Sequence, residues 1–334
     1  MKFLRFLTIS CMAFVALSSV SCKDKDEDAS TKEYLTGSIT FPFPSYLQKG
    51  DAVHVVPTGV YRGEDKLDTL LAFSWTDPIT GITDTLRLEN DPAGKSKEFD
   101  FVVSKDTLGS FSLVVSAWAE GYYVKSATAS FTIVNPAIGT GSLKGYDFLA
   151  SMPTFTDPRD NQKYYYNTVA GKDWMIQNLA WNGSGIAYNE AEAMSPIFGR
   201  FYTWTEANTA CPAGWHLPSS AEFKALAEAG GGTEDKAAGS MMVDASFNGN
   251  KMWEFWPDVR ITNTSRFSAI PAGYAVIENS KSVFKNLNKY AMFWTSDSID
   301  ADMAVARYIY EDKPVLFGGE FGKESIRASV RCIR

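Results

Sequence analysis

The sequence has few of the residues that metal sites and nucleophilic enzymes commonly use. Its 334 residues include two histidines and four cysteines, and no two cysteines have the close spacing typical of zinc sites. The glycine run 230–232 lacks the Lys-Ser/Thr pair that completes a phosphate-binding loop. His54 lies in a β-rich run and His216 in a turn, and we expect both to be structural. The sequence therefore predicts no catalytic residue, no metal and no cofactor.

Basic residues are fewer than acidic ones. The chain has 32 Lys and Arg against 39 Asp and Glu, which gives a net charge of -7. Binding to nucleic acid depends on a basic face that contacts phosphates, so we expect no nucleic-acid partner. A hydrophobic content of 45% and a charged content of 21% are typical of globular proteins, and the length accommodates two domains.

Only the N-terminus carries an extended apolar run, at residues 6–17, and this run is too short to span a bilayer. Basic residues precede it, and small residues followed by Cys22 come after it. This arrangement resembles a bacterial lipoprotein signal, in which the cysteine is acylated and begins the mature chain. We therefore expect residues 1–21 to be a signal peptide and Cys22 to carry lipid. An ordinary secretory signal with an incidental cysteine is the alternative.

The charged run that follows Cys22 cannot form a core and indicates a solvated acidic tether over residues 22–33. An acidic run in this place resembles the export signal of Bacteroidetes lipoproteins that reach the outer face of the outer membrane. We expect an outer membrane lipoprotein that is exposed at the cell surface and contacts the membrane through its lipid anchor. A plain spacer in a periplasm-facing lipoprotein is the alternative.

Residues 34–136 contain seven short β-rich runs separated by turn residues, without a helical period. This pattern predicts an all-β immunoglobulin-like sandwich, and the absence of a Cys–Trp–Cys pattern excludes the antibody type. Residues 137–148 are rich in Gly and Ser and indicate a linker. Three Asp-Thr-Leu tripeptides, at 68–70, 84–86 and 106–108, resemble a Bacteroidetes O-glycosylation motif, and strand starts after turns are the alternative.

The region 149–334 carries a series of landmarks in a fixed order. They are Asp157-Pro158-Arg159-Asp160-Asn161, GKDWMIQNL at 171–179, GRFYTW at 199–204, CPAGWHLPSSAEF at 211–223, FWTSD at 293–297 and SVRCIR at 329–334. In this order and spacing they resemble the Fibrobacter succinogenes major paralogous domain, a family thought to be similar to C-type-lectin-like folds. The resemblance implies an α+β C-type-lectin-like domain over residues 149–334. Within it, Ser219 followed by Glu222 predicts the capped start of a helix.

The cysteines allow one disulfide. Cys11 leaves with the signal and Cys22 carries lipid, so Cys211 and Cys332 remain in an oxidising compartment. The resemblance implies the same bond, between the end of a helix and the last strand. Two free buried thiols are the alternative. Because the bond uses both thiols, we do not expect the copper-dependent cysteine chemistry of formylglycine-generating enzymes, which the same stretch also resembles.

Two segments are candidates for ligand binding. The run 252–258 contains Trp253, Trp256 and Asp258, and two tryptophans beside carboxylates suit sugar stacking or an interface anchor. Trp294 and Asp297 lie where C-type lectins contact calcium and sugar. Core packing is the alternative for the tryptophans. A solvated acidic loop is expected in place of a calcium site, because calcium needs six to eight oxygen ligands.

We therefore expect a surface-anchored lipoprotein whose lectin-like domain binds a glycan or a surface protein without catalysis. A structural adhesin or surface-assembly component is the first alternative. An enzyme that acts on polysaccharide is the second, although no spacing of carboxylates singles out an acid and a nucleophile.

Overall fold

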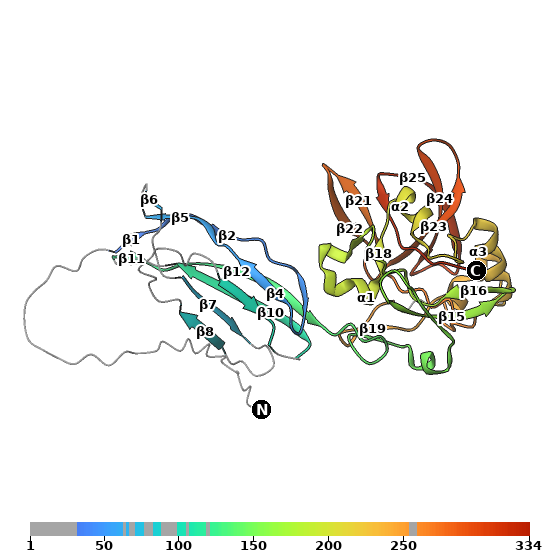
Figure 1. The fold of residues 1–334 in the computed structure, drawn as a ribbon, viewed down its shortest axis with the longest axis horizontal. Helices are drawn as coiled ribbons and strands as arrows, with labels where there is room; N and C mark the ends of the chain where they lie inside the picture. The colour runs from blue at the N-terminus through green and yellow to red at the C-terminus, as the bar shows by residue number, and fades with distance from the viewer. Residues whose placement is uncertain are drawn as a thin grey trace, which may run out of the picture.

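The structure is a computed structural model that describes residues 32–62, 65–66, 71–76, 83–87, 99–104, 107–117, 121–253 and 259–334. It consists mostly of β-strands in small sheets, with few and short helices. An N-terminal unit of strands and a larger C-terminal unit lie end to end (Figure 1). The predicted signal peptide, Cys22 and most of the acidic tether lie outside the described residues. Within the described part of the chain, no helix is long and apolar enough to cross a membrane.

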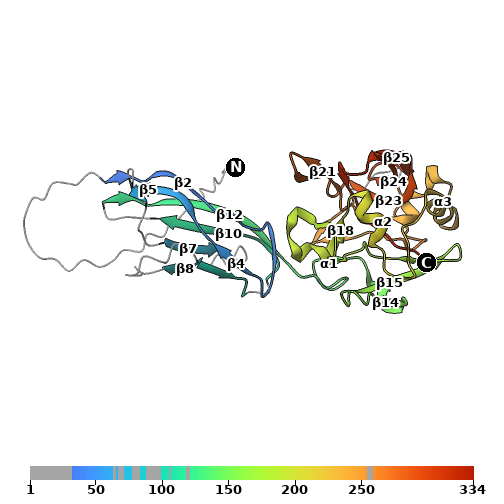
Figure 2. The same ribbon diagram turned by 45° about the horizontal axis from the view of Figure 1, so that its top comes forward.

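Twelve strands form the N-terminal unit in the described residues. They are β1 (Glu33–Tyr34), β2 (Thr36–Thr40), β3 (Tyr46–Gln48), β4 (Ala52–Val55), β5 (Thr58–Arg62), β6 (Asp65–Lys66), β7 (Leu71–Thr76), β8 (Thr83–Arg87), β9 (Phe99–Val102), β10 (Gly109–Ala117), β11 (Tyr122–Tyr123) and β12 (Lys125–Val134). A five-stranded sheet in the order β3-β12-β10-β7-β8 forms one layer. The smaller sheets β2-β5-β6 and β4-β9 lie across it (Figure 2).

The core of this unit lies between the layers, and strand β10 shows why the sequence folds this way. Its residues alternate, so that Phe111, Leu113 and Val115 are buried while the residues between them are half-buried. Phe131 of β12 stacks on Phe111, and Phe101 of β9 meets Phe131 from the other layer, with ring centroids 5.7 Å and 5.5 Å apart. Each full burial of such a side chain stabilises the fold by about 1.5–3 kcal/mol.

The predicted linker, residues 137–148, is folded, and part of it is buried. The Gly139 N–H donates to the Leu143 carbonyl (2.9 Å), and the Ser142 hydroxyl accepts from the Asn135 N–H (2.9 Å). A Cβ on Gly141 would lie 2.4 Å from the Asn135 carbonyl oxygen, so this glycine permits a close turn. Ser142, Leu143 and Tyr146 are buried. The Gly- and Ser-rich composition of this segment is typical of flexible linkers, but the segment forms a tight turn.

The two units also share apolar contacts at this connection, which we call the junction. Tyr46 of β3 packs against Tyr188 and Phe247 of the C-terminal unit, with ring centroids 5.9 Å and 6.3 Å away. Burial raises the pKa of Tyr46 above its ordinary value. Val134, the last residue of β12, belongs to a core cluster of the C-terminal unit. Strands β3 and β12 of the first unit therefore help to support the second unit.

The C-terminal unit combines short helices with five small sheets in the described residues. Its helices are η1 (Asp147–Ser151), η2 (Tyr188–Glu190), η3 (Glu192–Met194), α1 (Ser195–Phe198), α2 (Trp204–Ala210), α3 (Ser220–Ala229), η4 (Glu234–Lys236) and α4 (Ala238–Met241). Its strands are β13 (Leu143–Lys144), β14 (Thr154–Thr156), β15 (Lys163–Val169), β16 (Lys172–Met175), β17 (Ile186–Ala187), β18 (Arg200–Phe201), β19 (Ser246–Phe247), β20 (Asn250–Lys251), β21 (Tyr274–Glu278), β22 (Lys281–Lys285), β23 (Tyr290–Ser298), β24 (Met303–Tyr310), β25 (Leu316–Gly322) and β26 (Ile326–Arg327). The sheets have the orders β13-β19-β20, β14-β15-β16, β17-β18, β22-β21-β26 and β23-β24-β25.

Helices α2 and α3 begin with reciprocal capping boxes. The Ser219 hydroxyl accepts from the Glu222 backbone N–H (3.2 Å), and the Glu222 carboxylate accepts from the Ser219 N–H (2.8 Å). Thr203 and Glu206 form the same pair in α2. Burial alone would raise the pKa of Glu222, but hydrogen bonds from Ser219 and His216 hold that pKa below its ordinary value. The predicted helix start at Ser219 is confirmed.

The last residues of the chain run through the middle of the unit. Ile333 forms β-bridges with Trp174 and His216, and the Met175 N–H donates to the Cys332 carbonyl (3.1 Å). Cys332 is buried and bonded to Cys211, which directly follows α2, with an S–S distance of 2.09 Å. The bond spans 121 positions. The predicted disulfide is therefore confirmed.

Arg331 is fully buried beside this bond. Its guanidinium donates to the Asn178 side-chain oxygen (2.7 Å) and to the carbonyls of Met175 (3.1 Å) and Ser268 (3.1 Å), and also to that of Phe267. No carboxylate pairs with it among the described residues. Burial lowers the pKa of Arg331 to about 10. The charge is thus held by neutral oxygens that come from two separate parts of the chain, residues 175–178 and 267–268.

Candidate functional site

Two of the predicted ligand-binding tryptophans are part of the core. Trp253 and Trp294 are fully buried. Their indole N–H groups donate to the carbonyls of Ala269 (3.2 Å) and Tyr202 (2.8 Å). The prediction that these two rings contact a surface ligand is wrong, because neither ring reaches solvent. Trp256 and Asp258 lie outside the described residues.

Asp297, the remaining predicted ligand-binding residue, caps a helix. Its carboxylate accepts from the backbone N–H of Ser220 (2.6 Å), at the first turn of α3. Asp300 makes a local turn by accepting from the N–H groups of Asp302 (2.8 Å) and Met303 (2.7 Å), and these bonds lower the pKa of Asp300. In the described part of the chain, no three His, Cys, Asp or Glu residues are grouped to hold a metal ion.

Two further tryptophans have ring faces that the fold already covers. The Arg159 guanidinium lies 4.0 Å from the ring centre of Trp181, and a Cβ on Gly183 would lie 2.0 Å from a carbon of the same ring. The Lys323 ammonium lies 4.4 Å from the ring centre of Trp204. These rings are held between other groups and are not open platforms for a flat ligand.

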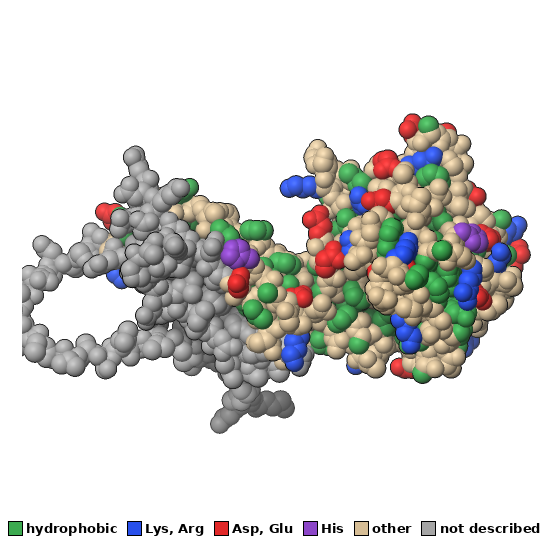
Figure 3. All heavy atoms as spheres, in the orientation of Figure 1, with side chains coloured by type: hydrophobic (Ala, Val, Ile, Leu, Met, Phe, Trp, Pro, Cys, Tyr) green, Lys and Arg blue, Asp and Glu red, His purple; other side chains and the backbone are tan. Residues whose placement is uncertain are grey.

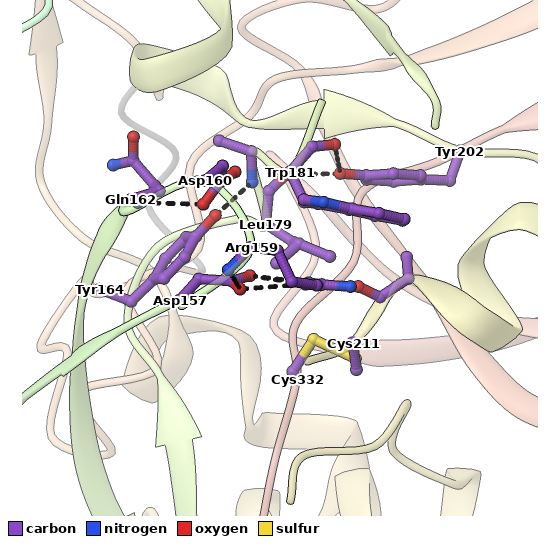
Figure 4. A network of polar contacts seen from close by, with 12 residues as sticks. Asp157, Arg159, Asp160, Gln162, Tyr164, Leu179, Trp181, Tyr202, Cys211 and Cys332 are labelled. Atoms are coloured by element: carbon purple, nitrogen blue, oxygen red, sulfur yellow. Dashed lines mark hydrogen bonds and ion pairs between the residues drawn. A yellow bond between two sulfur atoms is a disulfide. The ribbon is translucent and has the colours of Figure 1, made fainter. Parts of the chain in front are cut away.

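The landmark Asp157–Asn161 forms a polar network close to the disulfide (Figure 4). Asp157 is fully buried and accepts from Arg159 through Nε (3.0 Å) and Nη2 (2.7 Å). The same Nη2 donates to the carbonyl of Ala210 (2.8 Å), one residue before Cys211. Burial alone would raise the pKa of Asp157, but the hydrogen bonds from Arg159 lower it below its ordinary value. The network fixes the end of α2 and supports the fold.

Because its pKa is lower in the folded state, ionised Asp157 stabilises the protein above its unfolded pKa of about 3.9, and this contribution is lost as the pH falls below that value. We expect Asp157→Asn to lower the free energy of unfolding by about 1.5–3 kcal/mol at pH 7, the contribution of hydrogen bonds to a charged group. The loss should be clearly smaller at pH 3. Urea unfolding at both pH values tests this, with the exposed Asp147→Asn as control; equal losses at the two pH values would contradict it.

Several half-buried aromatic residues of the C-terminal unit gather at the β23-β24-β25 sheet. Cross-strand partners share a face, and the pairs Tyr290–Tyr310, Met292–Tyr308 and Tyr308–Phe317 place their side chains on the same side of β23-β24-β25. We call this surface the tyrosine face. Its members are all half-buried: Tyr274, Tyr290, Tyr308, Tyr310, Phe317 and Phe321.

The rings of the tyrosine face form a ladder across the strands. Tyr290 and Tyr308 are stacked with centroids 4.9 Å apart, and Tyr308 and Phe317 with centroids 5.2 Å apart. These spacings follow the distance between neighbouring strands, about 4.8 Å. Stacked rings cover one another's faces, so the ladder presents ring edges and hydroxyl groups to solvent. Burial and the adjacent Tyr308 hydroxyl raise the pKa of Tyr290, which keeps this hydroxyl neutral.

A glycine allows the rings to close over the sheet. A Cβ on Gly319 would lie 2.9 Å from the ring of Phe321 and 3.4 Å from that of Tyr308. Both sides of the sheet contribute to the core. Phe293 and Ile309 pack in a cluster with α3 on the opposite side, and on the side of the ladder the residues beyond it, Met292, Trp294, Ala304 and Ala306, are buried in a second cluster. The charged side chains of the C-terminal unit show no such grouping. Basic and acidic side chains are mixed over the face shown in Figure 3, without a large region of one sign.

The sequence interpretation missed the tyrosine face. A local signal was present, because Tyr308 and Tyr310, and then Phe317 and Phe321, lie an even number of residues apart and therefore on one side of a strand. Chemically, such a face combines large apolar rings with neutral donors and acceptors, which is the composition of protein interfaces.

Comparison with known proteins adds one match. No curated protein is similar enough to the chain to be matched. A family model, the Fibrobacter succinogenes major domain, matches residues 159–334, which is just over half of the chain. The match includes α2, α3, both cysteines of the disulfide and the whole tyrosine face. The chain belongs to the Fibrobacter succinogenes major domain family.

Proposed function

We propose that the C-terminal unit is a non-catalytic binding module that holds a protein partner on the tyrosine face. The observation that carries this proposal is the ladder of Tyr290, Tyr308 and Phe317, which is half-buried at the end of a sheet side that is otherwise core. Tyrosine is enriched among the residues that dominate binding energy, because one ring contributes both apolar area and a polar tip at a small entropy cost.

The geometry favours a protein over a glycan as partner. Sugar stacking needs an aromatic ring with an open face. Trp253 and Trp294 are buried, Arg159 and Lys323 each lie over one face of Trp181 and Trp204, and the inner faces of the ladder rings cover one another, which leaves the outer face of Phe317. Ring edges and hydroxyls suit the varied surface of a protein. The burial of Trp253 and Trp294 also supports the second candidate, an inert structural component of a surface assembly.

The finer architecture and the location belong to the same proposal. We infer that the N-terminal unit is an immunoglobulin-like stalk and that the C-terminal unit is C-type-lectin-like. Two packed layers of strands support the first inference, and a disulfide between a helix end and the chain end supports the second.

We also infer that acylated Cys22 anchors the protein to the outer membrane, exposed at the cell surface. The signal-like sequence before Cys22 supports this location. Metabolic labelling with a fatty acid, lost in Cys22→Ser, tests it.

The binding proposal is tested by photocrosslinking in intact cells. A photoreactive phenylalanine analogue in place of Tyr310 or Phe317 is expected to give a discrete protein adduct. The same analogue in place of Ile299, an exposed residue of the same unit, should not. Tyr308→Ser should remove the adduct, because it breaks the ladder at its centre. Adducts of equal strength at all three positions, or none at any, would overturn the proposal, and binding to a glycan array that Tyr308→Ser abolishes would assign the face to sugar.

A further inference from the structure

Strand β25 is an open edge next to the tyrosine face. It pairs with β24 along its whole length, from Leu316 opposite Ile309 to Gly322 opposite Met303. In the described residues it is the last strand of the β23-β24-β25 sheet, and no strand pairs with its other side. Helix η4 approaches β25 from the side away from the ladder, where Glu234 pairs with Arg307. An open edge presents unpaired backbone N–H and C=O groups, which can receive another strand.

This edge also lacks the features that usually protect edges. Natural proteins block open edges with proline, lysine, bulges or very short strands. The sequence LFGGEFG of β25 is seven residues long, without proline or lysine, and its pairing with β24 runs without a bulge. Two other edges of the unit are protected, because β22 begins and ends with a lysine and β14 has three residues. Unlike these two edges, β25 is protected neither by lysine nor by shortness, and its one charged side chain is that of Glu320.

The ladder and a single charge define what would fit. Phe317 is the last ring of the ladder, and a fourth strand about 4.8 Å beyond β25 would place an aromatic side chain where it stacks on Phe317. Glu320 is exposed, forms no ion pair with the described residues, and lies an odd number of positions from Phe317, hence on the opposite side of the strand. A basic residue of the added strand would pair with it. The side chains of Arg307 and Phe321 lie over Gly318 and Gly319, which separate these two positions.

We propose that β25 accepts an extended segment of the partner protein as a fourth strand, with an aromatic residue beside Phe317 and a Lys or Arg beside Glu320, three positions apart. The inference rests on the proposed function, since Phe317 belongs to the tyrosine face. Backbone hydrogen bonds hold the segment, and the two side chains on opposite sides of the strand select its sequence. A second copy of β25 fits less well, because it would bring a second carboxylate to the same edge.

The test uses fluorescent peptides of Thr and Val, with Lys at the seventh position and Tyr at the tenth, and fluorescence polarisation with the purified protein. In this order, a strand antiparallel to β25 places Lys beside Glu320 and Tyr beside Phe317. An isomer with Lys at the sixth position places both side chains on one side of the strand and is expected to bind about fivefold more weakly. Glu320→Lys should reverse the charge preference, so that the peptide with Glu at the seventh position becomes the tighter ligand. Glu320 is exposed, so this change should leave the fold intact.

Methylation of backbone amides identifies strand addition itself. N-methyl groups on alternate amides of the peptide should abolish binding for one alternate set and not for the other, because only every second amide faces β25. No binding of the matched peptide, an unchanged preference in Glu320→Lys, or equal effects of the two methylated sets would overturn the inference. A dimer of the protein that Phe317→Thr dissolves would also overturn it. Crosslinks at Tyr310 and Phe317 that persist in those cases would keep the proposed function and reject only the added strand.

Discussion

Replacement of Arg331 by methionine is expected to lower the free energy of unfolding by about 3–5 kcal/mol, which is enough to unfold many domains of this size. Methionine fills the volume of the arginine stem but has no donor. The oxygens of Asn178, Met175, Phe267 and Ser268 would then be buried without their partner. Each unsatisfied buried acceptor costs about 1–3 kcal/mol, partly relieved when the site relaxes. Urea unfolding measured by circular dichroism gives the value.

The chain contains a matched control for this change. Arg334 lies three residues later, on the surface, and its Nε donates to Asp173 (3.0 Å). Arg334→Met removes the same charge from the same strand, but the partner remains hydrated, so a loss of at most about 1 kcal/mol is expected. Similar losses in Arg331→Met and Arg334→Met would show that the buried guanidinium does not hold the centre of the unit together.

Removal of the disulfide is expected to cost about 5 kcal/mol. The bond between Cys211 and Cys332 closes a loop of 121 positions, and loop-closure entropy for that length gives this value. The double variant Cys211→Ala and Cys332→Ala avoids free thiols and leaves only a small cavity at the buried Cys332. Its unfolding midpoint in guanidinium chloride should match that of the reduced native protein, and a reductant should not affect it further. A double variant as stable as the oxidised protein would refute this expectation.

The correct predictions from sequence rest on short-range patterns or on counting. Ser219 and Glu222 lie three residues apart, so their capping box is a local property that tertiary structure has little reason to override. The prediction of the disulfide rests on compartment and number, since only two cysteines remain when those of the predicted signal and the proposed lipid site are set aside. The order of landmarks pointed to the family because it combines many separate local matches. None of these inferences required knowledge of which strand pairs with which.

The incorrect predictions concern burial, which distant segments decide. Trp294 lies in strand β23. Its side chain is buried only because the segment that contains Tyr202, 92 positions earlier, packs against it. Trp253 is likewise covered by the segment that contains Ala269. The tyrosine face also depends on distant segments. Tyr290 and Phe317 become neighbours of Tyr308 only through the register of three strands. Pairing of this kind is not encoded in any one window of sequence.

The packed junction has a mechanical consequence. Tyr46 is held between Tyr188 and Phe247, so bending of the two units at this point would expose aromatic surface. Under a pulling force the two units should therefore move together, without bending at the junction. With Cys22 anchored as proposed, a pull on the tyrosine face is carried through the junction to the N-terminal unit without slack between the two units. Movement of a bound partner relative to the cell would then come from the predicted tether over residues 22–33, not from the junction.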